Sequence, residues 1–126
     1  MIDELTVPEQ HALSRVAPRL LQAWKLNDDE CVQLLRLTTE EWDCLKNDQP
    51  NSPLGSEQMQ RVAVLIGVHA ALMRVYSGDI SRVARWIAAK NSGAIMNGRK
   101  PIEAMLQGGL PTMLRIRRLL QAEVAG

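Results

Sequence analysis

One long apolar segment constrains the fold of this 126-residue chain more than any other feature. Between Ser56 and Tyr76, two apolar stripes recur at helical spacing, so little of a helix here is left for water. Other elements must cover such a helix, and we predict an all-α fold with this segment as its central helix. The first stripe contains Met59, Val62, Ala63, Ile66, His69, Ala70 and Met73, and the second contains Leu65, Val68, Leu72 and Val75.

The composition favours the same class. The chain has three tryptophans, one tyrosine and no phenylalanine, so aliphatic residues and methionine must build the core. At this length it can bury a core as one domain or as two small lobes that share one. Prolines, a glycine and Asn and Ser residues gather between Asn47 and Ser56. We therefore predict an N-terminal lobe at 1–50 and a C-terminal small helical bundle at 51–126.

Small residues lie four apart on the remaining side of the central segment, at Ala63, Gly67 and Ala71. Such residues allow the close approach of another backbone. We expect either a neighbouring helix of the same chain or a helix of a second copy to pack there. His69 lies within the first stripe, and we interpret it as a core histidine with a hydrogen-bond partner rather than a catalytic or metal-binding residue.

A first helix is predicted near the N-terminus, with Met1–Thr6 frayed. Pro18 falls within its apolar pattern, and an interior proline loses a backbone hydrogen bond and clashes with the preceding turn. We expect a kink, or a fresh helix start near Ala17. The apolar face comprises Leu13, Val16, Ala17, Leu20, Leu21 and Trp24.

The segment 27–46 predicts a helix, a short turn and a second helix. The candidate caps are Asn27 or Asp28 for the first helix and Thr38 or Thr39 for the second. Glu41 follows Thr38 at the spacing of a capping box. Apolar residues fall where a helix-turn-helix motif buries them, at Cys31, Leu35, Leu37, Trp42 and Leu45.

The turn and the second helix of this motif are unusual. Arg36 stands where a turn glycine is common, and a positive φ costs a non-glycine residue about 1 kcal/mol, so we expect a distorted or differently built turn. The second helix offers Glu40, Glu41 and Asp43 against Lys46, although DNA affinity depends on cations that meet phosphates. We predict that this helix-turn-helix motif binds DNA poorly and that it serves packing or dimerisation rather than operator binding. Its candidate DNA contacts are Thr38, Thr39 and Lys46.

The next helix is predicted to follow the turn at Gly78-Asp79. Ile80, Val83, Ala84 and Ile87 are expected to face inward, and Arg82, Arg85 and Lys90 to face outward. Arg82 and Arg85 are interpreted either as a solvated face or as a partner contact.

Residues that make turns or that begin and end helices are concentrated between Arg85 and Gly109. Asn97-Gly98 predicts a turn, Pro101 suits the first position of a helix because its missing N–H costs nothing there, and Gly108-Gly109 ends that helix. Glu103 lies in the first turn, where the helix dipole favours a carboxylate.

Pro111 opens a last helix in which Arg115, Arg117 and Arg118 crowd together. The favourable interaction of basic side chains with the dipole at the helix C-terminus explains the presence of some of these arginines, but it does not explain all three. Arg117 could instead pair internally with Glu103. The apolar residues of this helix are Leu110, Met113, Leu114, Ile116, Leu120 and Val124.

From Leu20 to Gly126, about five-sixths of the chain, the order of these features resembles the Xre/MbcA/ParS-like antitoxin family. The resemblance is carried by LeuLeuGlnAlaTrpLysLeuAsn from Leu20, Trp42, the long helix, Trp86-Ile87, Asn97-Gly98-Arg99-x-Pro101, Gly108-Gly109 and ArgIleArgArgLeuLeuGlnAla from Arg115. Departures are the Arg36 turn, the acidic second helix, and MetAsnGly where an aromatic residue or glycine more often precedes Gly-Arg.

The resemblance implies a type II antitoxin with an Xre-like helix-turn-helix lobe and a C-terminal toxin-binding domain. Its partner would be a RES-domain toxin that consumes NAD⁺, neutralised by covering of the toxin's cleft. Homodimers, toxin–antitoxin hetero-oligomers and repression of the protein's own operon are also implied. The candidate toxin-binding residues are Arg82, Arg85, Arg99, Lys100, Arg115, Arg117, Arg118 and Gly126.

Catalytic and cofactor-binding patterns are absent from the sequence. It contains no nucleophile with a base, no glycine-rich phosphate loop and no metal constellation, so we predict neither an enzyme nor a cofactor. Cys31 and Cys44 have no CxxC spacing, and no signal-like run or ~20-residue apolar span occurs. We expect a cytoplasmic protein that does not enter a membrane.

Two functions therefore remain open: an interaction protein that neutralises a toxin, and a helix-turn-helix transcriptional regulator whose C-terminal domain mainly dimerises. Residues 1–50 hold ten acids and five bases, a net charge of −5, whereas residues 51–126 hold four acids and ten bases, a net charge of +6. Because the bases lie away from the second helix of the motif, the charge distribution favours the toxin-neutralising protein.

Overall fold

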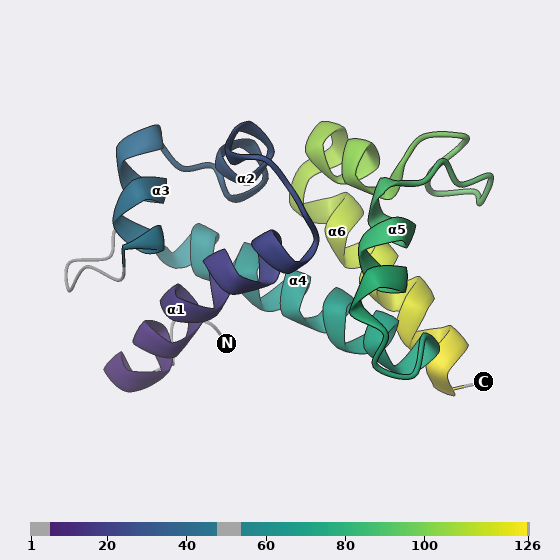
Figure 1. Ribbon diagram of the computed structural model, residues 1–126, viewed down its shortest axis with the longest axis horizontal. Helices are drawn as coiled ribbons and strands as arrows, with labels where there is room; N and C mark the ends of the chain where they lie inside the picture. The colour runs from purple at the N-terminus through teal and green to yellow at the C-terminus, as the bar shows by residue number, and fades with distance from the viewer. Residues whose placement is uncertain (1–5, 48–53, 126) are drawn as a thin grey trace. The chain divides into compact units, whose positions relative to one another are not determined.

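A computed structural model describes residues 6–47 and 54–125, in which the regular elements are all helices (Figure 1). The prediction of an all-α protein is confirmed for these residues. The chain forms two compact units, residues 1–63 (unit 1) and 64–126 (unit 2). The helices are α1 (Val7–Ala23), α2 (Asp28–Leu35), α3 (Thr39–Lys46), α4 (Ser56–Val75), α5 (Ile80–Ala88) and α6 (Pro101–Ala125).

Helix α1 begins with a capping box, which the sequence reading missed. The Thr6 side chain accepts from the Glu9 backbone N–H at 3.3 Å, and the Thr6 N–H donates to Glu9 Oε1 at 3.0 Å. The expectation that Thr6 frays is therefore wrong, since these two bonds satisfy donors at the helix start. Met1–Leu5 lie outside the described residues.

Helix α1 also continues through Pro18 without a break, so the fresh start expected near Ala17 is not observed. Ala17 and Leu21 are buried on either side of the proline, and their packing holds the helix together despite the lost backbone bond. Val16 was expected on the inner face but is 39% exposed, because it lies at the edge of the apolar arc.

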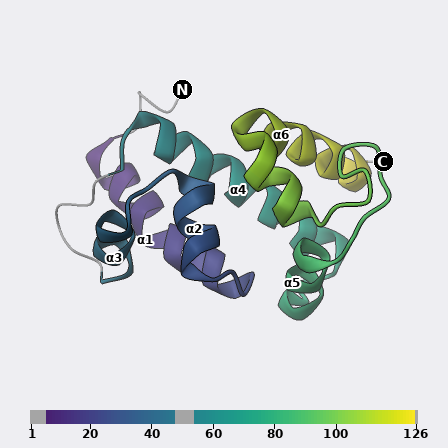
Figure 2. The same ribbon diagram turned by 90° about the horizontal axis from the view of Figure 1, so that it is seen from above.

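Helices α2 and α3 pack together within unit 1, and α3 also contacts α1 (Figure 2). Asn27 and Thr38 are the N-caps, each in a capping box with the glutamate three residues on, as Thr38 and Glu41 were predicted to be. The five apolar residues expected in the core, Cys31, Leu35, Leu37, Trp42 and Leu45, are all buried.

Helix α4 matches its predicted span to within one residue, but its burial differs from the two-stripe expectation. Leu65, Val68 and Leu72 are fully buried, as expected for the second stripe. Val75 ends that stripe and is 42% exposed, since it is the last residue of the helix. In the first stripe, Ala70 is exposed and Ile66, His69 and Met73 are half-buried.

Unit 2 packs α5 against α6. The Asp79 side chain caps α5 by accepting from the backbone N–H groups of Ser81 and Arg82. Val83, Ala84 and Ile87 are buried as expected, whereas Ile80 is 38% exposed because it is the first residue of the helix.

The loop from α5 to α6 contains the predicted turn (Figure 1). Asn97 and Gly98 both have positive φ, 52° and 84°, and the Arg99 N–H donates to the Met96 carbonyl across them. Pro101 is the first residue of α6, and Gly109 breaks that helix with φ 67° and ψ −152°. The predicted turn, helix start and helix break are confirmed.

Within the described residues, no single helix is long and apolar enough to cross a membrane. Helices α4 and α5 have the length and the apolar composition of a membrane span only when they are taken together, and they are bent by 118° at the break between them.

Gly67 leaves room for the Arg117 side chain of α6 against α4 within unit 2. A Cβ atom at position 67 would lie 2.6 Å from Cδ of Arg117, whose aliphatic stem crosses the helix there. The neighbour that packs on Gly67 is thus a side chain of the same chain, one of the two alternatives that the small-residue pattern left open.

We predict that Gly67→Leu lowers the free energy of unfolding by about 1–3 kcal/mol, because the larger side chain overpacks against Arg117. Gly67→Ala should be nearly neutral, since the flexible arginine can shift and alanine favours the helix by about 1 kcal/mol. Urea denaturation measures both. Gln60→Leu, at an exposed position of α4, is the matched control; an equal loss in the control would contradict the overpacking explanation.

Candidate functional site

The three candidate DNA contacts lie in unit 1 at α3. The Thr38 hydroxyl accepts from the Glu41 N–H at 3.1 Å, so this side chain caps the helix. Thr39 is exposed. The Lys46 ammonium lies 3.3 Å from both carboxylate oxygens of Asp28 and 3.5 Å from Asp43 Oδ1. The one lysine of α3 is therefore largely neutralised by its own chain.

Asp28 joins the start of α2 to α3. Its Oδ1 accepts from the Trp42 ring N–H at 2.9 Å as well as from Lys46, and these two hydrogen bonds lower the pKa of Asp28. The contribution of this lowered pKa to stability is present above the ordinary pKa of an aspartate and is lost as the pH falls through the lower folded-state value. The arrangement anchors α3 and leaves its outward face acidic.

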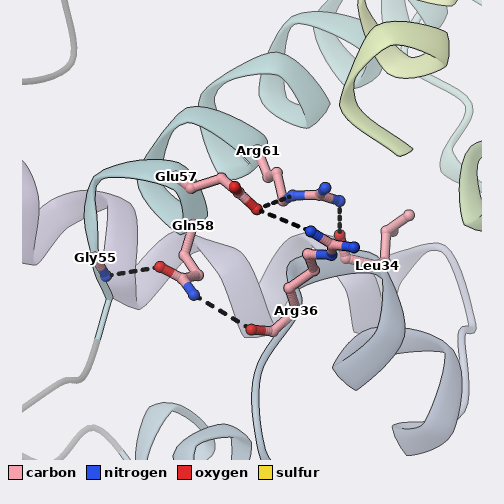
Figure 3. A network of polar contacts seen from close by, with 6 residues as sticks. All are labelled: Leu34, Arg36, Gly55, Glu57, Gln58 and Arg61. Carbon is pink, nitrogen blue, oxygen red and sulfur yellow. Dashed lines mark hydrogen bonds and ion pairs between the residues drawn. The ribbon is translucent and has the colours of Figure 1, made fainter. Parts of the chain in front are cut away.

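The turn between α2 and α3 is built around Arg36, which adopts φ 57° and ψ 52°. This left-handed conformation is the one that the position requires and that glycine would adopt without strain. The Arg36 carbonyl accepts from the Gln58 side-chain amide at 3.2 Å, and Gln58 Oε1 in turn accepts from the Gly55 N–H at 3.0 Å (Figure 3). Side chains at the start of α4 thus hold the strained turn.

A second contact holds the end of α2. Arg61 is only 6% exposed, and its guanidinium donates to the Leu34 carbonyl at 3.0 Å and to Glu57 Oε2 at 3.2 Å (Figure 3). Glu57 also lies 3.8 Å from the Arg36 guanidinium. Arg61 therefore satisfies a carbonyl that the last turn of a helix leaves without an intrahelical donor. The sequence reading missed this network, whose signal is the polar triplet Glu57, Gln58 and Arg61 at one helical turn's spacing.

All of the candidate toxin-binding residues fall within unit 2. Arg82, Arg85, Arg115 and Arg118 are exposed, and none has a carboxylate within 4.0 Å in the described part of the chain. The Arg82 guanidinium lies 5.9 Å from the centre of the Tyr76 ring. Residues 64–126 contain nine bases and three acids, a net charge of +6, whereas residues 1–63 contain six bases and eleven acids, a net charge of −5.

Arg99 and Lys100 lie where the loop enters α6. The Arg99 guanidinium donates to the Met96 carbonyl at 2.9 Å, to the Ile95 carbonyl at 3.1 Å and to Gln107 Oε1 at 2.6 Å. Arg99 therefore stabilises the turn, and most of its donors are already used. Lys100 is half-buried.

Glu103 accepts from the Lys100 backbone N–H at 2.9 Å and thereby caps α6. No ion pair joins Glu103 to Arg117 among the described residues. Arg117 is half-buried, with its stem over Gly67. Gly126, the last of the candidate toxin-binding residues, lies outside the described part of the chain.

The remaining titratable candidates offer little chemistry. Burial raises the pKa of the Cys31 thiol to about 12, so this cysteine stays protonated. Burial lowers the pKa of the half-buried His69. In residues 6–47 and 54–125, no three His, Cys, Asp or Glu side chains are placed to hold a metal ion.

Comparison with known proteins gives one weak similarity. The chain is 26% identical over 129 residues to the uncharacterized protein y4oB of Sinorhizobium fredii, with 98% of this chain and 91% of that protein covered. No family model matches the chain, and neither does any solved structure. The relative's name states no function.

We predict that Arg61→Met lowers the free energy of unfolding by about 1–3 kcal/mol, because it leaves the buried Leu34 carbonyl without a donor while preserving bulk. Glu57→Gln should cost less, since the bond from Arg61 to Leu34 remains. Thermal unfolding followed by circular dichroism measures both, with exposed Arg15→Met as control. A loss no larger than in that control would mean that Arg61 does not stabilise the turn.

Proposed function

We propose that this protein is a type II antitoxin that binds and neutralises a RES-domain toxin by covering its NAD-binding cleft. The ordered resemblance from Leu20 to Gly126 is the source of this assignment. The observation that carries the binding role is the separation of charge: exposed arginines of unit 2 lack carboxylate partners in the described residues, whereas the cation of α3 is paired. The protein acts by association, as a homodimer or a toxin–antitoxin hetero-oligomer, and not as an enzyme.

Four exposed arginines make up the proposed toxin-binding surface: Arg82 and Arg85 on α5, and Arg115 and Arg118 on α6. Unpaired surface charges raise association rates with an oppositely charged partner and set its orientation. An acidic rim on the toxin would complement them. Arg99 has the different role of shaping the turn before α6.

We also propose that α2 and α3 form the helix-turn-helix of an Xre-like lobe, with Arg36 in the glycine position of the turn. The caps, the left-handed turn and the buried apolar set support this arrangement. Glu40 and Asp43 are exposed on α3, and Lys46 is paired. This charge pattern disfavours the alternative function of a DNA-binding regulator.

The free protein should therefore bind its own promoter weakly, or only when assembled with toxin. A gel-shift assay at physiological salt tests this, with Glu40→Lys and Asp43→Lys expected to strengthen binding through new phosphate contacts. Tight, sequence-specific nanomolar binding by the free wild-type protein would contradict the prediction and would favour the regulator.

The main test is co-expression with the toxin encoded beside this gene. The intact chain should restore growth and cellular NAD⁺, whereas a chain that lacks Gln121–Gly126 should remain folded but fail to protect. Leu120 is the last buried residue of the described part of α6, so this deletion spares the core.

Charge reversal provides a matched comparison. Arg115→Glu with Arg118→Glu should abolish protection, whereas Arg15→Glu with Arg19→Glu, an equal change on exposed positions of α1, should not. Full protection by the truncated chain would indicate that the contact surface lies at Arg82 and Arg85. No protection by the intact chain would refute the proposed function.

A further inference from the structure

Unit 2 contains an open groove of about 250 Å³ whose lining includes none of the four exposed arginines of the proposed toxin-binding surface. It lies between α4 and the last turns of α6. Its floor on α4 is formed by small residues, of which Ala70 is exposed, Gly67 is half-buried and Ala71 is buried. Its lining residues are Gly67, Ala70, Ala71 and Arg74 from α4, and Gln121, Val124 and Ala125 from α6.

One charged residue, Arg74, lines the groove. Arg74 is exposed and also lines an adjoining hollow with Val75, Glu123 and Val124. Although Glu123 shares that hollow, no carboxylate of the described residues lies within 4.0 Å of the Arg74 guanidinium. The groove thus combines an apolar floor with an available cation.

We propose that this groove binds an acidic amphipathic helix of the toxin, with an apolar side chain over Ala70 and a carboxylate one turn away on Arg74. The inference rests on the proposed antitoxin function and adds a second contact to the surface formed by the four exposed arginines. The volume of the groove is below the roughly 300–1,000 Å³ of small-molecule sites. An open groove floored by small residues instead suits a second helix, whose anchors recur at three- and four-residue spacing.

Charge selects the occupant. A symmetric contact between two copies through this groove would bring together two surfaces whose residues 64–126 each carry a net charge of +6, although Glu123 lies beside Arg74. Like charges across an interface suppress such pairing, whereas an acidic helix gains from the same field. The apolar floor argues against nucleic acid, which would require cations along the groove rather than alanines.

The test is calorimetric titration of the neighbouring gene's toxin into the intact protein and its variants. Ala70→Gln fills the groove and Arg74→Glu reverses its charge, and each should weaken binding about tenfold or more. Both positions are exposed, so melting temperatures should not change. Ala122→Gln, exposed on α6 but outside the groove, and Arg15→Glu on α1 are the matched controls and should bind as the wild type does.

The outcomes separate the two proposals. If the wild type and both groove variants bind equally, the groove inference is overturned and the antitoxin function stands. If the wild type neither binds nor protects, both are overturned. If Arg74→Glu changes the mass of the free protein in sedimentation, a second copy of the chain is the occupant of the groove. If the groove variants lose promoter binding alone, DNA is the occupant. Either result overturns the proposal.

Discussion

The bond from the Arg61 guanidinium to the Leu34 carbonyl is the interaction on which unit 1 most depends. Helix α2 ends in a left-handed residue that is not glycine, and its last carbonyls need donors. Arg61 and Gln58 supply them from the start of α4. These two contacts hold the turn through which the chain leaves α2, and Asp28 separately anchors α3 through Trp42 and Lys46.

Holding the Arg36 turn with a buried arginine has a physical cost and a benefit. A buried guanidinium must be paired, and Glu57 provides the charge while the Leu34 carbonyl provides a second acceptor. In return, a strained arginine can occupy a position that would otherwise require glycine. The left-handed Arg36 is therefore compatible with a stable turn because α4 holds it from outside, and not because its own propensity favours it.

The two units use charge in different ways. In unit 1, Lys46 and Arg61 are bound to acidic side chains of the same chain, so these cations contribute to internal structure. In unit 2, Arg99 is similarly committed to the loop, but Arg74, Arg115 and Arg118 have no acidic partner in the described residues. Exposed Arg15 and Arg19 of unit 1 also lack a carboxylate partner in the described residues, but residues 1–63 carry a net charge of −5 and residues 64–126 a net charge of +6, which is why the proposed contacts concentrate in unit 2.

Features whose chemistry is local could be derived from the sequence alone. The Thr38 capping box, the Asn97-Gly98 turn, Pro101 at a helix start and the break at Gly108-Gly109 each involve residues within four positions of one another. Tertiary structure decided the rest. Which residues of one apolar stripe are covered depends on the neighbouring helices, since Val62 is buried and Ala70 of the same stripe is exposed. The Arg61 contact spans 27 residues of sequence, and the groove beside Ala70 requires α4 and α6 to meet, so no local pattern could specify either.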